Sequence, residues 1–398
     1  MGAEVTIEWE PHTKQREVIQ SGARWRVLCW GRRSGKNEVA IIETLRYSLE
    51  HSGATVWWIA PSYSQANDYG FDRLLAMVPD ALVRGEPKLT SPREVEFVNG
   101  TTVSFKSAEK PKNLKGAGVD YVNCDEAASW PGIVWYEYVR PTLADSEGGG
   151  MIFSTPKGKG WFFDMATRGM DESDASVFYS HATSYDNPFV ADAEIDEQKE
   201  NMPQYIFEQE YLAEFSEDGG EVFPEVPIED YALDGRQGVP PYRIGVDYAR
   251  VQDWTVVTVL DADGYVVELE RVNQTSWHAI QKLIENTYSK YSPATVRVDA
   301  TRDNKITEDL NAAGIPVEPV NFSAKKNEIV EDTAVMLESG ELTIPEGAST
   351  LRKEMAAFGY NLTSHGNVQY GAEDGKHDDH VDSLCLAATA PEPMRATW

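Results

Sequence analysis

The residues with the clearest chemical potential form a short glycine-rich stretch from Gly31 to Asn37. It lies between an apolar run that predicts a buried strand and a run that predicts a helix. Such a loop aims backbone N–H groups, a helix dipole and the charge of Lys36 at one point, which suits a phosphate. Only three residues separate Gly31 from Gly35, and Asn37 stands where a Ser or Thr normally ligates Mg²⁺. An ordinary capped helix start is the alternative.

Two adjacent acids, Asp125 and Glu126, follow a mostly apolar strand-like run. In a nucleotide-hydrolysing sheet the first acid can hold Mg²⁺ and the second can polarise the attacking water. The alternative is that Asp125 only caps the next helix. Because the loop and the acid pair occur together, we favour nucleotide hydrolysis. Ser154 and Thr155 end a further apolar run and are candidates to sense the γ-phosphate, with a simple turn as the alternative.

A second set of acids lies in the C-terminal half of the chain. Asp247 and Asp299 each end a predicted strand, and three more acids open a predicted helix near the C-terminus (Asp378, Asp379 and Asp382). This order is the pattern of the RNase H type of fold, in which carboxylates hold two divalent metals for phosphodiester cleavage. Asp379 and Asp382 are three apart and are expected to share one helix face. The oxygen-rich surroundings favour Mg²⁺ or Mn²⁺ over zinc.

The elements that must position these residues can be predicted from the pattern of apolar residues. The runs 27–30, 54–60, 119–124 and 151–153 predict strands of a mostly parallel sheet. Residues 94–105 alternate around Asn99-Gly100, which predicts a hairpin. Helices are expected at 64–78, from Trp161 and over 206–215, and three strands in a meander begin at Tyr242. These patterns divide the chain into a domain at 1–215, an irregular linker at 216–241 and a domain at 242–398.

Composition limits the class of protein. The chain has 398 residues, with 65 acids against 36 bases and a formal net charge of −29. Such acidity argues against a uniformly basic nucleic-acid-binding surface, and leaves either a confined basic track or an acidic surface adapted to high salt, a halophilic protein. Three isolated cysteines in apolar stretches predict buried thiols. No apolar run is long enough to span a bilayer, so we expect no membrane association and no signal peptide.

Taken in order, these motifs resemble the large terminase subunit of tailed viruses, over nearly the whole chain. The resemblance implies an α/β protein with an N-terminal P-loop (RecA-like, ASCE) ATPase domain and a C-terminal RNase H-like nuclease domain. ATP and Mg²⁺ are the implied cofactors, with Mn²⁺ able to substitute in the nuclease. The implied partners are double-stranded DNA, the portal protein of the procapsid and a small terminase subunit, in a homo-oligomeric ring that is expected to be a pentamer. The implied location is the host cytoplasm, docked on the portal.

The resemblance also suggests roles for individual residues. Gly31, Arg32, Arg33, Ser34, Gly35 and Lys36 match the family's short phosphate loop, with Arg32 or Arg33 stabilising transferred charge. Gln15 matches the glutamine that reads adenine, although a solvated helix residue is the simpler alternative. Ser154 and Thr155 match the coupling motif, and Arg73 is a candidate, on position alone, for an arginine supplied to a neighbouring subunit. The expected function is ATP-driven DNA packaging with metal-dependent cutting. A repair or recombination helicase-nuclease and a nucleotide-gated DNA-binding scaffold with weak ATPase are the alternatives.

Overall fold

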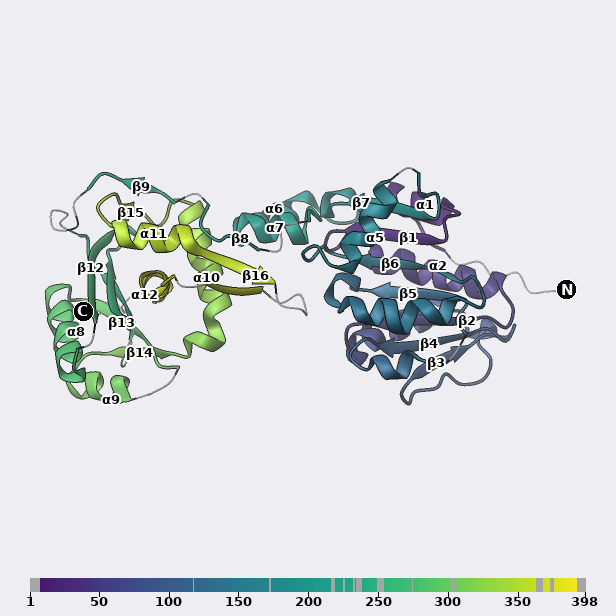
Figure 1. Ribbon diagram of the computed structural model, residues 1–398, viewed down its shortest axis with the longest axis horizontal. Coiled ribbons are helices and arrows are strands. Elements are labelled where there is room, and N and C mark those ends of the chain that lie inside the picture. Colours follow the sequence, from purple (N-terminus) through teal and green to yellow (C-terminus); the bar gives the residue numbers. More distant parts are fainter. Residues whose placement is uncertain are drawn as a thin grey trace. The chain divides into compact units, whose positions relative to one another are not determined.

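The computed structural model describes residues 8–116, 118–171, 173–215, 219–224, 226–231, 233, 238–248, 254–273, 275–301, 305–362, 368–372 and 376–391. The chain divides into two compact units. The first is built mainly from Met1–Lys199 and Gln204–Asp218, and the second mainly from Gly219–Asn361 and Val368–Trp398. Each unit contains its own sheet and core (Figure 1).

The first unit is organised around a seven-stranded sheet in the order β3-β4-β2-β5-β6-β1-β7. All neighbouring strands are parallel except the β3–β4 pair. The strands are β1 (Trp25–Trp30), β2 (Thr55–Ala60), β3 (Arg93–Glu96), β4 (Thr102–Ser107), β5 (Tyr121–Asp125), β6 (Gly149–Ser154) and β7 (Val177–Ala182). The predicted parallel sheet and the predicted hairpin around Asn99-Gly100 are therefore both confirmed.

Helices cover both faces of this sheet. Leu28 and Trp30 of β1 pack on one side with α1 (Thr13–Gln20), α2 (Lys36–Glu50) and α4 (Asp72–Met77). Val27 and Cys29 pack on the other side with α5 (Trp161–Met170) and the helical turns of 127–143. The predicted helix over 64–78 is built from α3 (Tyr63–Gln65), a π-helical segment (Ala66–Phe71) and α4. Alternating burial along β1 thus produces a three-layer α/β/α unit.

The end of the first unit differs from the prediction of a helix over 206–215. After α6 (Asp192–Glu200), α7 (Gln204–Glu210) stops at Glu210. The carbonyl of Tyr211 then accepts a hydrogen bond from the backbone of Ser184, and the carbonyl of Ala213 accepts one from the thiol of Cys29. Because these carbonyls bond to the turn that follows β7 and to β1, they are not available to a helical ladder.

The second unit has a five-stranded sheet in the order β12-β11-β10-β13-β14. The antiparallel meander β10–β11–β12 is extended by β13 and β14, which run parallel to β10. The strands are β10 (Tyr242–Asp247), β11 (Trp254–Leu260), β12 (Val266–Asn273), β13 (Ala294–Asp299) and β14 (Val317–Val320). The predicted meander is confirmed, and Asp247 and Asp299 end neighbouring strands as expected.

Helices also cover both faces of the second sheet. Its core on one side includes residues of α8 (Trp277–Lys290) and α9 (Lys305–Ala312), and α12 (Asp379–Ala388) lies against the other. Helices α10 (Phe322–Glu338) and α11 (Ser349–Ala357) contact α12. A Cβ atom on Gly245 of β10 would lie 2.1 Å from the carbonyl oxygen of Ser383, so a glycine is required where α12 crosses the sheet.

Short strands complete the second unit. β8 (Gly219–Glu221), β16 (Phe358–Leu362) and β17 (Val368–Ala372) form a three-stranded sheet, and β9 (Ile228–Glu229) pairs with β15 (Ile344–Pro345). β8 and β9 lie within the segment that the sequence pattern predicts to be an irregular linker.

The three cysteines are free and buried, as predicted. Over the part of the chain that the structure describes, no helix has the length and apolarity needed to cross a membrane.

Candidate functional site

The phosphate loop, Gly31–Lys36, is held through its carbonyl groups, four of them by side chains from outside the loop and one by Ser34 within it. Five consecutive carbonyl oxygens each lie within hydrogen-bonding distance of a side chain. The pairs are Gly31 with Ser34 Oγ at 2.6 Å, Arg32 with Ser184 Oγ at 2.6 Å, Arg33 with Asn187 Nδ2 at 2.6 Å, Ser34 with His12 Nε2 at 2.9 Å, and Gly35 with Gln15 Nε2 at 3.1 Å. A trans peptide points its N–H opposite to its C=O. The N–H groups of Arg32 and Ser34 donate to the carbonyls of Glu210 and Gly31, so this arrangement can direct inward those of Arg33, Gly35 and Lys36, as an anion cradle requires.

The two glycines of the loop permit neighbouring groups to approach its backbone closely. A Cβ on Gly31 would lie 2.3 Å from the carbonyl oxygen of Tyr211, and one on Gly35 would lie 2.7 Å from Gln15 Nε2. Gly35 also has a φ of 88°, in the left-handed region that favours glycine. α2 begins at Lys36, which places the positive end of its dipole at the loop. Both glycines therefore have a structural reason beyond the motif.

The predicted acid pair lies beside the loop. Lys36 Nζ is 3.6 Å from Glu126 Oε1, and Ser154 Oγ donates to Glu126 Oε2 at 3.1 Å. Asn37 Nδ2 is 3.3 Å from Asp125 Oδ2. Asp125 is buried, and burial together with the charge of Glu126 raises its pKa to about 7 against the opposing effect of Lys36. The structure thus brings five of the predicted residues into direct contact, and a cation at Asp125 would offset the cost of its burial.

Lys36, Asn37, Asp125 and Glu126 line a cleft of about 1320 Å³. Its lining includes Arg32, Arg33, Thr155 and Arg73, whereas Ser154 is fully buried behind it. The Arg32 guanidinium pairs with Glu210, with 2.7 Å between Nε and Oε2. Arg73 lies on the wall of the cleft in its own chain, so its supply to a neighbouring subunit stays a prediction.

The structure places Gln15 against the loop. Its Oε1 accepts from the backbone N–H of His12 at 3.1 Å, and its Nε2 donates to the carbonyl of Gly35. The side chain is 1% exposed, so it is not the solvated helix residue of the alternative interpretation. It holds the loop and α1 together, and adenine reading stays a prediction.

The second set of acids gathers at the carboxyl ends of β10 and β13 and the start of α12. Val246 is the register partner of Val298, so Asp247 and Asp299 leave adjacent strands side by side. Burial raises the pKa of Asp247 well above its usual value, and the charges of Asp382, Asp379, Asp299 and Asp378 raise it further. The five acids named from the sequence therefore share one electrostatic environment.

Two cations balance the acids at the start of α12. Lys326 of α10 lies 3.1 Å from both Asp378 and Asp382, which are one helical turn apart. Asp379 is instead 3.6 Å from Arg271 of β12. Burial raises the pKa of Asp382 to about 7 against the opposing effect of Lys326. Burial lowers the pKa of Lys326, but the charges of Asp382 and Asp378 raise it above its usual value.

The donor set suits a hard divalent cation, because it consists of carboxylate oxygens whose mutual repulsion such an ion would relieve. Among the described residues, however, no three His, Cys, Asp or Glu side chains already form a ready-made ligand group. Ligation would therefore require these side chains to reorient, including those that Lys326 and Arg271 hold.

Several residues that support one or the other of the two sites carry no sequence signal. His12, Ser184 and Asn187 bond to the phosphate loop from elements distant in sequence. Glu354 of α11 accepts from the backbone N–H of His380 at 2.8 Å, next to Asp379. Lys326 and Glu354 are charged, but neither lies in a sequence pattern that marks it as part of a site.

Comparisons with known proteins agree with this architecture. Two family models match, "Terminase large subunit, T4likevirus-type, N-terminal" at residues 27–229 and "Terminase RNaseH-like domain" at residues 244–390. The large terminase subunit of Thermus virus P23-45 is 32% identical, over 96% of this chain and 87% of that relative. The large terminase subunit of Escherichia phage T5 is 25% identical, over 92% of this chain and 85% of that relative.

Among solved structures, a large terminase from a thermophilic bacteriophage matches with a TM-score of 0.58 and 14% identity, over 96% of this chain and 99% of that chain. That likeness supports the fold, with its two α/β domains. The family models and the extent of the sequence relationship together identify the protein class. The chain belongs to the terminase large-subunit family, as an enzyme with an ATPase domain and an RNase H-like nuclease domain.

Proposed function

We propose that this chain hydrolyses ATP in the cleft of its first unit to drive viral double-stranded DNA into a procapsid. Lys36 and the inward N–H groups of the phosphate loop bind the β- and γ-phosphates, and Arg32 or Arg33 stabilises the transferred charge in cis. Asp125 and Asn37 are the residues that would hold Mg²⁺, which supplies charge neutralisation on the phosphate oxygens when it is bound. Glu126 orients and activates the attacking water.

The observation that carries this proposal is the placement of Glu126. One of its oxygens faces Lys36 at 3.6 Å and the other accepts from Ser154 at 3.1 Å. A carboxylate beside the phosphate-binding lysine is in position to act on water at the γ-phosphate. Its bond to Ser154, at the end of β6, gives a direct route by which a change at Glu126 alters the segment carrying Thr155. We assign Ser154 and Thr155 to this coupling.

We further propose that the second unit cuts the DNA concatemer. Asp247, Asp299 and Asp379 hold the divalent metals, with Asp378 or Asp382 assisting, and Mg²⁺ is the expected ion with Mn²⁺ as a substitute. The support is the shared electrostatic environment of these acids at the ends of β10 and β13.

We place the limits of the ATPase domain at 1–215 and of the nuclease domain at 242–398, with 216–241 between them.

The test is a pair of isosteric substitutions in the full chain. Glu126→Gln should reduce ATP turnover by at least about a hundredfold, in keeping with general-base loss, and leave Mn²⁺-dependent plasmid cleavage intact. Asp299→Asn should abolish cleavage and leave ATP turnover intact. Loss of both activities in both variants would refute the division of labour between the two sites.

The partners of this activity are double-stranded DNA, the portal protein of the procapsid and a small terminase subunit. We place the active assembly, a homo-oligomeric ring that we expect to be a pentamer, on the portal in the host cytoplasm, with Arg73 reaching the neighbouring subunit's nucleotide. Translocation that depends on procapsids would support packaging over a repair helicase-nuclease. ATP binding without turnover, with DNA and portal present, would instead support a nucleotide-gated scaffold.

The net charge of −29 supports a proposal about working conditions. An acidic surface stays hydrated in concentrated salt, so we propose that the protein is halophilic. Stability and ATP turnover should then rise towards molar KCl. A maximum in dilute buffer, with a decline in molar KCl, would reject this idea.

A further inference from the structure

The strand that carries the acid pair presents a polar row to the helix that carries Lys36. Along β5, the side chains of Tyr121, Asn123 and Asp125 face α2, whereas Val122 and Cys124 belong to the core on the opposite side of the sheet. Asn123 is fully buried, at 0% exposure, although it is neither charged nor part of a known motif. A buried amide in a sheet core costs free energy unless it is hydrogen-bonded. Among the described residues its Oδ1 has no partner, so the hydrogen bond that its Nδ2 makes is informative.

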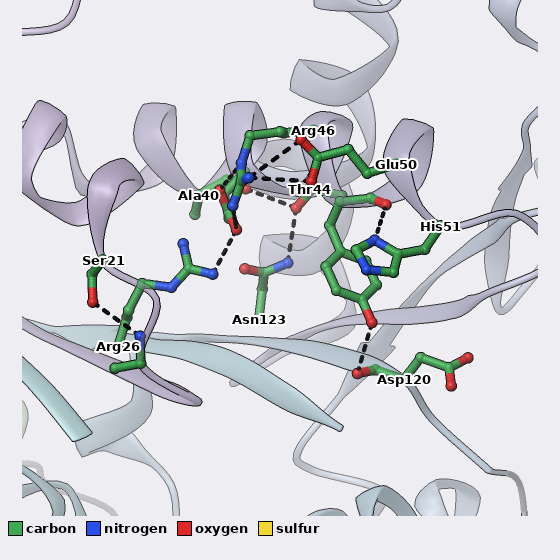
Figure 2. Close-up of polar contacts among 12 residues, drawn as sticks. Ser21, Arg26, Ala40, Thr44, Arg46, Glu50, His51, Asp120 and Asn123 are labelled. Carbon is green, nitrogen blue, oxygen red and sulfur yellow. Dashed lines mark hydrogen bonds and ion pairs between the residues drawn. The ribbon is translucent and has the colours of Figure 1, made fainter. Parts of the chain in front are cut away.

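Each residue of this row meets a residue of α2. Asp125 faces Asn37 at 3.3 Å, Asn123 donates from Nδ2 to Thr44 Oγ1 at 2.8 Å, and the rings of Tyr121 and Tyr47 stack with centroids 4.5 Å apart. We call these three pairs the α2–β5 seam. Figure 2 shows its middle, where Asn123 rises from the sheet to Thr44 on the helix above.

The middle pair is directional. Thr44 Oγ1 gives its one proton to the carbonyl of Ala40 at 2.7 Å and therefore acts as an acceptor towards Asn123. Thr44 is also fully buried, so water cannot replace either partner. Because a hydrogen bond requires a narrow range of distance and angle, this bond is made in one register only. A slip of one residue along β5 would turn Asn123 to the opposite face.

We propose that Asn123 and Thr44 are positioning residues of the nucleotide site, which lock α2 and β5 in the register where Asn37 meets Asp125. This inference rests on the proposed ATPase function. Asn123 lies two residues before Asp125 on the strand, and Thr44 lies two helical turns after Asn37. The pair thus fixes the distance between the two residues that would hold Mg²⁺, without touching either of them.

The test measures equilibrium binding of fluorescent methylanthraniloyl-ADP to the full chain with and without Mg²⁺. Asn123→Leu and Thr44→Val should each reduce the Mg²⁺-dependent gain in affinity by about five- to tenfold, the factor that corresponds to one buried hydrogen bond. The affinity without Mg²⁺ should change by less than about twofold. The double variant should lose no more than either single variant, because the two residues act through one bond.

Two matched controls separate positioning from general destabilisation. Ser48→Ala removes a fully buried hydroxyl that has no hydrogen-bond partner among the described residues, one turn further along α2, and should keep the Mg²⁺-dependent gain. Thr44→Ser keeps the hydroxyl and should retain the wild-type response. Where Asn123→Leu fails to fold, Thr44→Val, which exchanges one hydroxyl for a methyl group, decides the question.

The outcomes separate this inference from the proposed function. A folded Thr44→Val variant that keeps the full Mg²⁺-dependent gain, beside a wild type that shows it, would overturn the positioning role alone. Equal losses with and without Mg²⁺ would also overturn it, since they indicate a structural effect. A wild type with neither the gain nor ATP turnover would overturn the proposed function, and this inference with it.

Discussion

Substitution of Glu43 should strongly destabilise the first unit, because it would leave a buried charge unpaired. Glu43 is fully buried in α2, and its carboxylate pairs with Arg26 of β1 at 2.6 Å. The Arg26 side chain is 7% exposed, and within the described part of the chain its Nε and Nη1 atoms have no hydrogen-bond partner. Removing Glu43 therefore leaves a guanidinium in the core between sheet and helix without the carboxylate that balances it.

The magnitude follows from this geometry. Breaking a buried ion pair by removing one partner costs about 3–5 kcal/mol, whereas replacing both partners with apolar residues is often neutral. At about 2–4 °C per kcal/mol for a unit of this size, Glu43→Leu should lower the melting temperature by roughly 6–20 °C. Arg26→Met combined with Glu43→Leu should recover most of that loss.

Differential scanning calorimetry of the full chain measures both changes. Arg46→Met is the control, because Arg46 contacts the same carboxylate at 2.8 Å but its side chain is 39% exposed. Its loss should cost no more than about 1 kcal/mol, as expected for a solvent-screened pair. A Glu43→Leu protein that melts within about 2 °C of wild type, less than the shift expected for 1 kcal/mol, or a double variant as unstable as the single one, would refute the reasoning.

Three further predictions concern the two sites. In metal-free buffer, Asp125→Asn should stabilise the protein by an amount that grows between pH 4 and about 7 and is then constant at about 2–4 kcal/mol, because burial raises the pKa of Asp125 to about 7 and its ionisation opposes folding. Calorimetry over a pH series checks this, and a pH-independent difference would contradict it. Gly31→Ala should abolish binding of methylanthraniloyl-ADP, since its Cβ would lie 2.3 Å from the Tyr211 carbonyl oxygen; binding at wild-type affinity would show that the loop can move. Gly245→Ala should cost at least about 1–3 kcal/mol by forcing α12 away from the sheet, and should weaken plasmid cleavage; unchanged melting would count against that packing.

The sequence predicts the fold class well because the pattern of apolar runs is local. The parallel sheet, the hairpin at Asn99-Gly100 and the β10–β12 meander follow from periodicity and turn chemistry. The helix expected over 206–215 shows the limit of this approach. Its C-terminal part has helical composition, but its carbonyls bond to Ser184 and Cys29 from other parts of the chain. Such competition is tertiary and has no local signature.

The same limit applies to the sites. Asp125, Glu126 and Lys36 could be named because their residue types follow strands or loops in a recognisable order. His12 and Asn187 could not, since a histidine or an asparagine near a helix start or in a turn is common, and only folding brings it to the phosphate loop. Sequence spacing alone also could not determine how the acids at the start of α12 are shared between Lys326 and Arg271.

Two of the four non-glycine residues with a positive φ in the described part of the chain lie at the nucleotide site. Arg33 and Glu126 have φ values of 57° and 46°, in a region that non-glycine residues rarely adopt. Each such residue costs on the order of 1–3 kcal/mol and persists only where its surroundings fix it. Asn187 bonds to the carbonyl of Arg33, and Lys36 and Ser154 hold the side chain of Glu126. The side chains that bond to this shortened loop and to Glu126 therefore have a further role. They maintain the strained backbone that directs loop N–H groups and the Glu126 carboxylate into one cleft.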